Sequence, residues 1–165
     1  MAGSGWPHVA ALDVRLMSVE LIPARLGHLL ALARQVDPGR LALMRKIHAD
    51  PRRAIASMFD QSRSVLALRV DGHVIAAYGL VGALLGDGVM IWVLASPAVA
   101  RHAMAFMRAC RDEYRRLAVA EERVTALIIA SDDVAIRFAR QWGFRIAEEV
   151  TNGAHLGVLE FQRAA

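Results

Sequence analysis

The sequence predicts a single α/β domain with a mixed central sheet flanked by helices. The chain has 165 residues, which is the size of one ordinary domain. Its hydrophobic fraction of 56% and charged fraction of 22% exclude a disordered or collagen-like chain. The hydrophobic repeat is helical in the first third and becomes strand-like near Ser64, after which strand and helix patterns alternate. Segments of both kinds in one chain indicate a sheet covered by helices.

The N-terminal part is predicted to be a flexible lead-in at residues 1–13, followed by a strand and helices. Val14–Ile22 alternates apolar and polar side chains, which is typical of a strand. Pro23 ends this strand and can open a helix through Leu26 to about Arg34. Pro38 begins a second helix, and Asp50 followed by Pro51 is a typical start of a third.

Two adjacent strands, Ser64–Val70 and His73–Val81, are predicted to form a hairpin around Asp71-Gly72, a type I′ turn sequence. Val89–Ala95 is predicted to be the next strand. The apolar run from residue 74 to 100 is interrupted by Gly86-Asp87-Gly88, and each half is too short for a membrane-spanning helix. Two core strands are therefore predicted, with cover on both faces.

A long amphipathic helix is predicted from Pro97 to about Leu117. Its expected apolar face consists of Val99, Ala103, Phe106, Cys110, Tyr114 and Leu117. Its expected polar face carries Arg101, Arg108, Asp112 and Arg115. The arginine row Arg108, Arg111, Arg115 and Arg116 is predicted to be a solvated helix face.

The C-terminal part is predicted to be a strand, a short helix and a closing hairpin. Val124–Ala130 is a buried strand, and Ser131-Asp132-Asp133 supplies N-cap candidates for a helix that Gly143 ends. Arg145–Val150 and His155–Gln162 pair around Asn152-Gly153.

Composition also limits the chemistry. The net charge is +4, from 20 basic and 16 acidic residues. One cysteine, Cys110, excludes a disulfide framework within the chain and is predicted to be a small core residue rather than a nucleophile. The histidines have no metal-ligand spacing, so no metal site is expected. Trp92 and Trp142 are predicted to be packing residues. No secretory signal is visible, so the protein is expected not to be secreted.

The element order and one segment resemble the Gcn5-related N-acetyltransferase (GNAT) superfamily, from Val14 onward. The segment is Ala135-Ile136, followed by Gly143-Phe144, which is similar to the superfamily's Asn-x-x-Ala-Ile helix that ends in Gly-Phe. The resemblance implies a GNAT-like fold. It also implies acetyl-CoA as cofactor if the protein is an active N-acyltransferase.

A narrower similarity is to bacteriophage GNAT-like proteins, among them a small internal virion protein of short-tailed phages. It depends on Trp92-Val93-Leu94, Arg101-His102 and Phe106-Met107-Arg108, in this order. This resemblance implies a phage-encoded protein, located in a virion or in the host cytoplasm.

The superfamily's catalytic positions are poorly matched. Its coenzyme A pyrophosphate loop is rich in glycine, and the corresponding residues here include Arg101, His102 and Ala103, of which only the alanine fits. Arg101 and His102 are candidates to hold an anion by their side chains. The general-acid tyrosine of many relatives corresponds to Ala139, and Val89–Ala95 carries no carboxylate to serve as base.

Three functions follow. The first is a GNAT-like protein with degenerate acetyltransferase machinery and no cofactor, which acts as a virion or assembly component through a protein partner or a homo-oligomer. The second is an active acetyl-CoA-dependent N-acetyltransferase on an unidentified amine. The third is a basic accessory protein that binds DNA. The first is favoured by apolar residues without an evident core position, namely Trp6, Leu84, Leu85, Met104 and Met107.

Overall fold

The structure is a computed structural model that describes residues 18–36, 38–82 and 88–161. Its strands are β1 (Val19–Pro23), β2 (Ser62–Val70), β3 (His73–Gly82), β4 (Val89–Ala95), β5 (Arg123–Ile129), β6 (Arg145–Thr151) and β7 (Ala154–Glu160). Its helices are α1 (Leu26–Gln35), α2 (Pro38–Ile47), α3 (Pro51–Gln61), the 3-10 turn η1 (Pro97–Ala100), α4 (Ala103–Ala120) and α5 (Asp133–Gln141).

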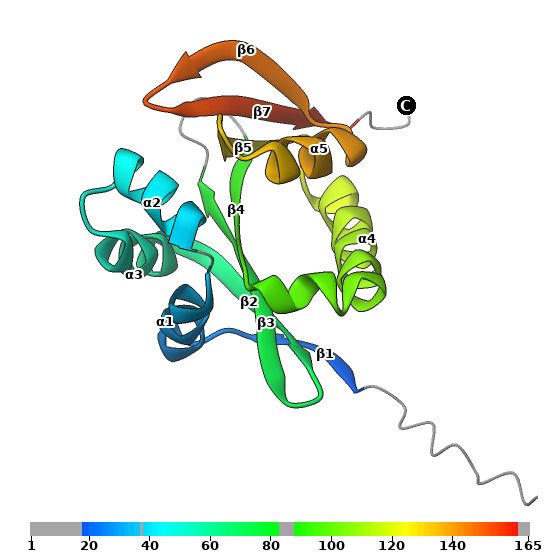
Figure 1. Ribbon diagram of the computed structural model, residues 1–165. Coiled ribbons are helices and arrows are strands. Elements are labelled where there is room, and N and C mark those ends of the chain that lie inside the picture. The colour runs from blue at the N-terminus through cyan, green and yellow to red at the C-terminus, as the bar shows by residue number, and fades with distance from the viewer. Residues whose placement is uncertain (1–17, 37, 83–87, 162–165) are drawn as a thin grey trace, which may run out of the picture.

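The strands form one mixed sheet of seven strands in the order β1-β2-β3-β4-β5-β7-β6. Neighbouring strands are antiparallel except β4 and β5, which are parallel. Helices α1–α3 lie on one side of the sheet, and α4 and α5 lie on the other (Figure 1). The predicted α/β class, and the adjacency of the four strands β2 to β5, are confirmed.

Both predicted hairpin turns are confirmed by their backbone angles. Asp71 has φ 48° and Gly72 has φ 82° between β2 and β3. Asn152 has φ 52° and Gly153 has φ 80° between β6 and β7. Two successive residues with positive φ define the type I′ turn, whose twist matches that of the flanking strands.

The start of the first helix differs from the prediction. Pro23 does not open the helix, because it is the last residue of β1 and pairs with Leu66 of β2. Arg25 is still extended and is the N-cap of α1, which begins at Leu26. The start of α3 is confirmed, since the Asp50 side chain accepts hydrogen bonds from the N–H groups of the first turn. The part of the predicted strand before residue 18 lies outside the described residues.

The predicted long helix is divided into the 3-10 turn η1 and the helix α4. Most of its predicted apolar face is confirmed, since Leu117 is buried and Phe106, Cys110 and Tyr114 are half-buried, whereas Ala103 is exposed. Ala105 and Glu113 are also buried and were not predicted to be.

Three clusters of buried residues form the core. The first joins α1 and α3 to the sheet and includes Leu29, Leu32, Ile55 and Trp92. The second lies between β2, β3 and α4 and consists of Leu68, Val70, Ile75, Ala76 and Ala105. The third connects the two halves of the sheet to α4 and consists of Leu80, Val89, Leu117, Val124 and Leu159.

The prediction that β4 and β5 are buried on both faces is wrong in part. Val93 of β4 is 51% exposed and Leu127 of β5 is 55% exposed. The run from residue 74 to 100 contains β3 and β4, as predicted, and no helix in the described ranges is long and apolar enough to span a membrane. The predicted lead-in, residues 1–13, and the loop residues Leu84, Leu85 and Asp87 lie outside the described residues.

Candidate functional site

A split in the sheet lies between β4 and β5. The two strands are paired only at Val89 with Val124 and at Met90 with Thr125. Gly88 permits this contact, because a Cβ atom there would lie 2.6 Å from the Arg123 carbonyl oxygen. Beyond Met90 the strands diverge (Figure 1). The rest of β4 therefore has β3 on one side and no described strand on the other, so its backbone groups on that side have no ladder partner.

A cavity of about 950 Å³ occupies this split and reaches both faces of the sheet. From β4 and β5 it is lined by Met90 to Ala95 and by Ala126 to Ile129. On the α4 side it is lined by Phe106, Ala109, Cys110, Glu113, Tyr114, Phe138, Ala139 and Trp142. On the opposite side it is lined by Met44, His48, Ile55, Met58 and residues of β6 and β7. Its size and largely apolar lining are typical of a small-molecule site.

Trp92 forms a fixed part of the cavity wall. Gly79 on β3 gives room for its indole ring, since a Cβ atom at that position would lie 2.4 Å from the ring. The indole Nε1 donates a hydrogen bond of 2.9 Å to Ser62 Oγ. Trp92 is 9% exposed and belongs to the core, as predicted, and it also lines the cavity.

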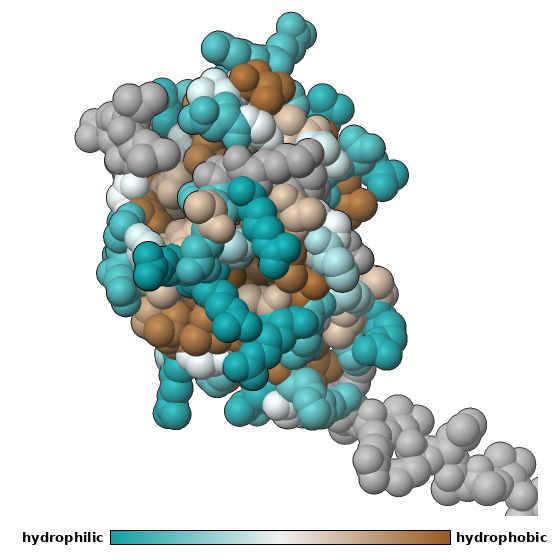
Figure 2. All heavy atoms as spheres, turned by 60° about the vertical axis from the view of Figure 1, so that its left-hand side comes forward, coloured by the Kyte–Doolittle hydropathy of each residue, from teal (hydrophilic) through white to brown (hydrophobic). Residues whose placement is uncertain are grey.

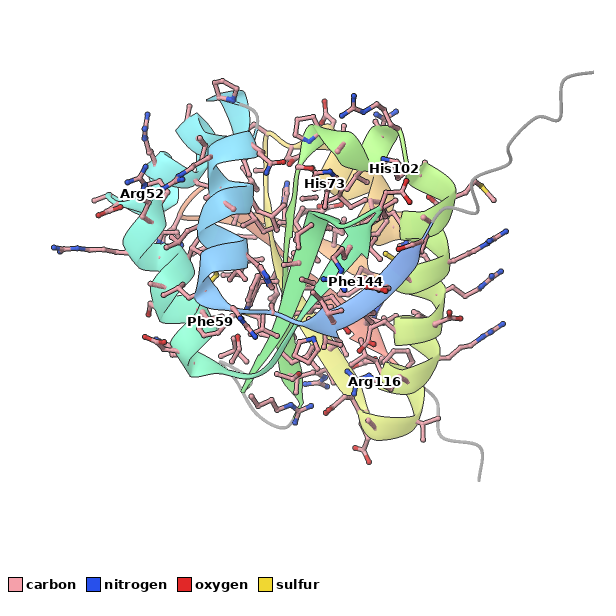
Figure 3. All side chains as sticks on the ribbon, turned by 90° about the horizontal axis from the view of Figure 1, so that it is seen from below. Arg52, Phe59, His73, His102, Arg116 and Phe144 are labelled. Carbon is pink, nitrogen blue, oxygen red and sulfur yellow. The ribbon has the colours of Figure 1, made fainter. Side chains whose placement is uncertain are left out.

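Glu113 is a buried carboxylate on the α4 side of the cavity. It forms an ion pair with Arg116, one helical turn away. Tyr78 of β3 faces both residues, and its hydroxyl is buried without a hydrogen bond. Burial and the Glu113 carboxylate raise the pKa of Tyr78 well above its ordinary value. Arg116 (Figure 3) is exposed like Arg108, Arg111 and Arg115, as predicted for the solvated row, and in addition it is paired with Glu113.

Cys110 precedes Glu113 by one turn and is half-buried. Burial, with a smaller contribution from Glu113, raises the pKa of the Cys110 thiol to about 12. The thiol is therefore protonated at neutral pH, which agrees with the prediction that Cys110 is not a nucleophile.

Aromatic side chains connect α4 and α5. The ring centroids of Phe106 and Phe138 are 5.7 Å apart, and those of Tyr114 and Trp142 are 5.6 Å apart. Tyr114 also meets Phe161 at 5.2 Å. Trp142 is a packing residue, as predicted, although its indole N–H is buried without a hydrogen bond. These contacts hold α5 beside the split.

Arg101 and His102 lie between η1 and the first residue of α4, Ala103 (Figure 3 labels His102). Arg101 is exposed, and His102 Nδ1 is buried without a hydrogen bond. The N–H groups of Val99, Arg101 and His102 donate to carbonyl oxygens within the same turn, at 3.0 to 3.3 Å. The loop therefore does not present these donors to an anion, and only the first turn of α4 has N–H groups without an intrahelical acceptor.

Acetyl-CoA, the cofactor that the GNAT fold implies, fits this site in part. The diverging edge of β4 offers unpaired backbone groups to the amides of a pantetheine arm. The loop before α4 fits a pyrophosphate less well, because its backbone donors are used internally and no glycine lies between Ser96 and Ala103. Binding of the pyrophosphate would therefore depend on the side chains of Arg101 and His102 and on the N–H groups of the first turn of α4.

Two features were noted from the sequence: alanine at position 139 and the lack of a carboxylate on β4. In the structure, both Ala139 and β4 line the cavity. Ala139 is 7% exposed on α5 and lines the cavity. Glu113 was not predicted from the sequence, although its spacing indicates its place: it lies three residues after Cys110 and four before Leu117, on the apolar face of the helix. No group of three or more potential metal ligands occurs among the described residues.

Neither a family model nor a curated protein sequence matches the chain. Solved structures do match. The ribosomal-protein-S18-alanine N-acetyltransferase from Escherichia coli aligns with a TM-score of 0.64 at 17% identity, over 90% of this chain and 97% of that chain.

Two further matches were solved with ligands. The yncA protein from Salmonella typhimurium, with its cofactor acetyl-CoA, aligns with a TM-score of 0.57 at 15% identity, over 90% of this chain and 96% of that one. The paia N-acetyltransferase from Thermoplasma acidophilum, in complex with coenzyme A, gives 0.60 at 12% identity, over 87% and 99%. Together with the sheet order and the split beside β4, these similarities show that the chain has the GNAT acetyltransferase fold.

Proposed function

We propose that the protein is an N-acyltransferase that uses an acyl-CoA thioester bound in the split between β4 and β5. The observation that carries this proposal is the cavity of about 950 Å³ that passes through the sheet where the two strands diverge. A cavity open to both faces lets a thioester and an amine approach one another from opposite sides. Structural neighbours that hold acetyl-CoA or coenzyme A support the choice of cofactor.

The reaction forms an amide bond from the amine nitrogen, breaks the thioester C–S bond and moves one proton from nitrogen to sulfur. Bound acyl-CoA supplies the activated acyl group. The chain supplies the backbone edge of β4 to orient it and a largely apolar cavity around it. Alignment of the two reactants alone removes a large part of the barrier, about 7 kcal/mol or more in favourable cases.

Proton transfer depends on other residues than those of the superfamily's usual pattern. Ala139 has no proton to donate, and β4 carries no carboxylate. Within the described lining, Glu113 is the buried carboxylate, and it lies beside the split, paired with Arg116. In this proposal Glu113 takes up the amine proton, directly or through water.

The proposal is tested by titrating the protein with acetyl-CoA in a calorimeter. Because the loop before α4 lacks a backbone cradle, we expect weak binding that depends on Arg101. Arg101→Ala should weaken it by about 1.5–3 kcal/mol, the scale of a charge-assisted hydrogen bond. Arg108→Ala removes an exposed arginine from α4, seven residues further along the chain, and should leave the affinity unchanged. Absence of acetyl-CoA binding would contradict the proposal.

The non-catalytic alternative has its own supporting observations. Arg101 stands where the superfamily has glycine, Ala139 replaces the general acid, and the loop donors are used internally. These features fit a protein with vestigial machinery that acts through protein contacts, for which a phage virion or its assembly is the setting that the narrower sequence resemblance implies. A protein that binds no acetyl-CoA and is retained by a partner from an infected-cell lysate would favour this alternative.

The third hypothesis, a DNA-associated accessory protein, has one supporting observation. Long side chains that end in nitrogen project from the outer side of α4 (Figure 3). Arg108 and Arg111 belong to this exposed row. DNA binding that weakens with salt and is lost in Arg108→Ala would favour this hypothesis.

A further inference from the structure

The C-terminal half of the sheet has an uncovered apolar face within the cavity. Leu127 of β5 and Leu156 of β7 are direct partners in the antiparallel ladder. They are 55% and 38% exposed, and both line the cavity. Their strand neighbours Val124 and Leu159 point to the α4 side, where they belong to the core. Since side chains alternate along a strand, Leu127 and Leu156 lie on the α1–α3 side of the sheet.

The other walls on this side are also apolar. Met44 of α2 and Met58 of α3 line the same cavity, and methionine side chains adapt to the shape of what they contact. Trp92, fixed by Ser62 and Gly79, adds a rigid aromatic surface. Figure 2 shows the molecule from the side of α1–α3, with apolar side chains visible between polar ones. On this side, the cavity is therefore lined by one rigid aromatic surface and by methionine side chains that can adapt to a ligand.

The charged residues among the described lining of the cavity are carboxylates. They are Glu113, Asp132 and Glu149, and no arginine or lysine is among the described lining residues. This contrasts with the whole chain, in which basic residues outnumber acidic ones by 20 to 16. Glu149 of β6 lines the cavity together with Thr151, which pairs with Ala154, two residues before Leu156. Arg123 and Arg145 border Leu156 outside this cavity, and both are paired with Glu160. Carboxylates beside an apolar wall attract a cation and disfavour an anion.

We propose that the amine acceptor is an apolar amine, an aliphatic or aromatic body that carries an ammonium group and no anionic group. Its body lies on Leu127 and Leu156, opposite α2 and α3, and its nitrogen points to the split. This substrate class rests on the proposed function. The binding site itself does not, because an amine can occupy it without acyl-CoA.

The test measures amine binding by calorimetry on the full chain without acyl-CoA. The probes are n-butylamine, n-hexylamine and n-octylamine, with octanoate and spermidine for comparison. Each methylene buried on the apolar wall contributes about 0.8 kcal/mol, so the affinity should rise about fourfold per added methylene. Octanoate has the same apolar body and the opposite charge, and it should bind at least tenfold more weakly than octylamine. Spermidine, a polyamine with charges spread along its length, should also bind at least tenfold more weakly than octylamine.

Variants locate the site. Leu127→Ser and Leu156→Ser remove apolar area from the wall, and each should weaken octylamine binding about tenfold or more. Val134→Ser is the matched control, because Val134 is 58% exposed on α5 and does not line the cavity. Leu127 and Leu156 are partly exposed, so these variants are expected to fold, which circular dichroism melts check. An equal effect of all three variants, or affinity independent of chain length, would overturn the proposal.

The outcomes also separate this proposal from the proposed function. Leu127-dependent binding of octylamine without any acyl transfer supports the site and contradicts the transferase. Transfer from acetyl-CoA to spermidine, unaffected by Leu127→Ser, supports the transferase and overturns the apolar substrate. The proposal is also overturned if Leu127→Ser changes the preference between acetyl-CoA and octanoyl-CoA while octylamine affinity stays the same, because the wall would then hold the acyl chain.

Discussion

The buried Glu113 carboxylate affects the ionisation of the neighbouring Tyr78 and Cys110 side chains. The Glu113 carboxylate keeps a single ion-pair partner, Arg116, and lies beside a phenol and a thiol. Both of these groups are held in their neutral forms, because burial and the nearby negative charge disfavour ionisation. The cluster thus carries a carboxylate and a guanidinium, with no second anion on the α4 side of the split among these residues.

Replacing Tyr78 by Phe should raise the free energy of unfolding by about 1 kcal/mol. The Tyr78 hydroxyl is buried without a hydrogen bond, and its removal relieves the cost of taking a polar group out of water. Urea denaturation of the wild type and of Tyr78→Phe measures the difference. A loss of stability would contradict the prediction and show that the hydroxyl donates to the Glu113 carboxylate in solution.

At the level of single elements, the end of α5 explains the Gly-Phe pair that the sequence analysis used. Gly143 has φ 86°, as predicted for a residue that ends a helix in the left-handed conformation. The Gly143 N–H donates to the Arg140 carbonyl oxygen and the Phe144 N–H to that of Ala139, both at 3.0 Å. This is the Schellman motif, which directs the chain from α5 into β6.

Gly143→Ala should lower the free energy of unfolding by about 1 kcal/mol. The cost is conformational, because the added Cβ atom would lie 3.4 Å from Leu159 Cδ1, an ordinary contact. Gly27→Ala is the matched control: Gly27 lies in α1 with nothing within 4 Å of an added Cβ, so this change should leave stability equal or higher. Thermal melts that show no difference between Gly143→Ala and the wild type would contradict the assigned cap.

Local signals account for the elements that the sequence predicted well. The positions of β3 and β4 follow from an apolar run interrupted by Gly86-Asp87-Gly88. The two hairpins follow from Asp71-Gly72 and Asn152-Gly153, whose residues tolerate positive φ. The inward face of α4 was predicted from Phe106, Cys110, Tyr114 and Leu117, but the break between the 3-10 turn at Pro97 and the helix was not.

The candidate site was only partly predictable for a different reason. Arg101, His102, Ala103 and Ala139 were located by comparison with a motif, and the structure places Ala139 at the cavity. The split depends on where two distant strands stop pairing, which no local pattern encodes. The exposure of Leu127 follows from that split, so a buried strand was predicted where a cavity wall occurs.

At the scale of the whole molecule, the same split divides the sheet into two halves. One half contains β1 to β4, and the other contains β5, β7 and β6, with only two residue pairs joining β4 to β5. Continuity between the halves therefore depends on side chains, chiefly the core cluster of Leu80, Val89, Leu117, Val124 and Leu159. Where the backbone pairing between the halves is short, packing against α4 contributes more to holding them together.

Leu117→Ala should therefore do more than lower stability. Leu117 is 5% exposed in the cluster that connects the halves, and a buried leucine-to-alanine change costs about 2–5 kcal/mol. Leu29→Ala is the matched control, since Leu29 is fully buried in the cluster between α1 and the N-terminal half. Both variants should lose stability, but only Leu117→Ala should uncouple the halves, because Leu29 contacts one of them.

Trp92 and Trp142 report on the two halves separately. Urea denaturation is therefore followed by the fluorescence of each of them in variants in which the other one and Trp6 are replaced by Phe. Coincident transitions are expected for Leu29→Ala and separate midpoints for Leu117→Ala. Coincident midpoints in Leu117→Ala would show that the two ladder pairs and the aromatic contacts between α4 and α5 suffice to keep the sheet one cooperative unit.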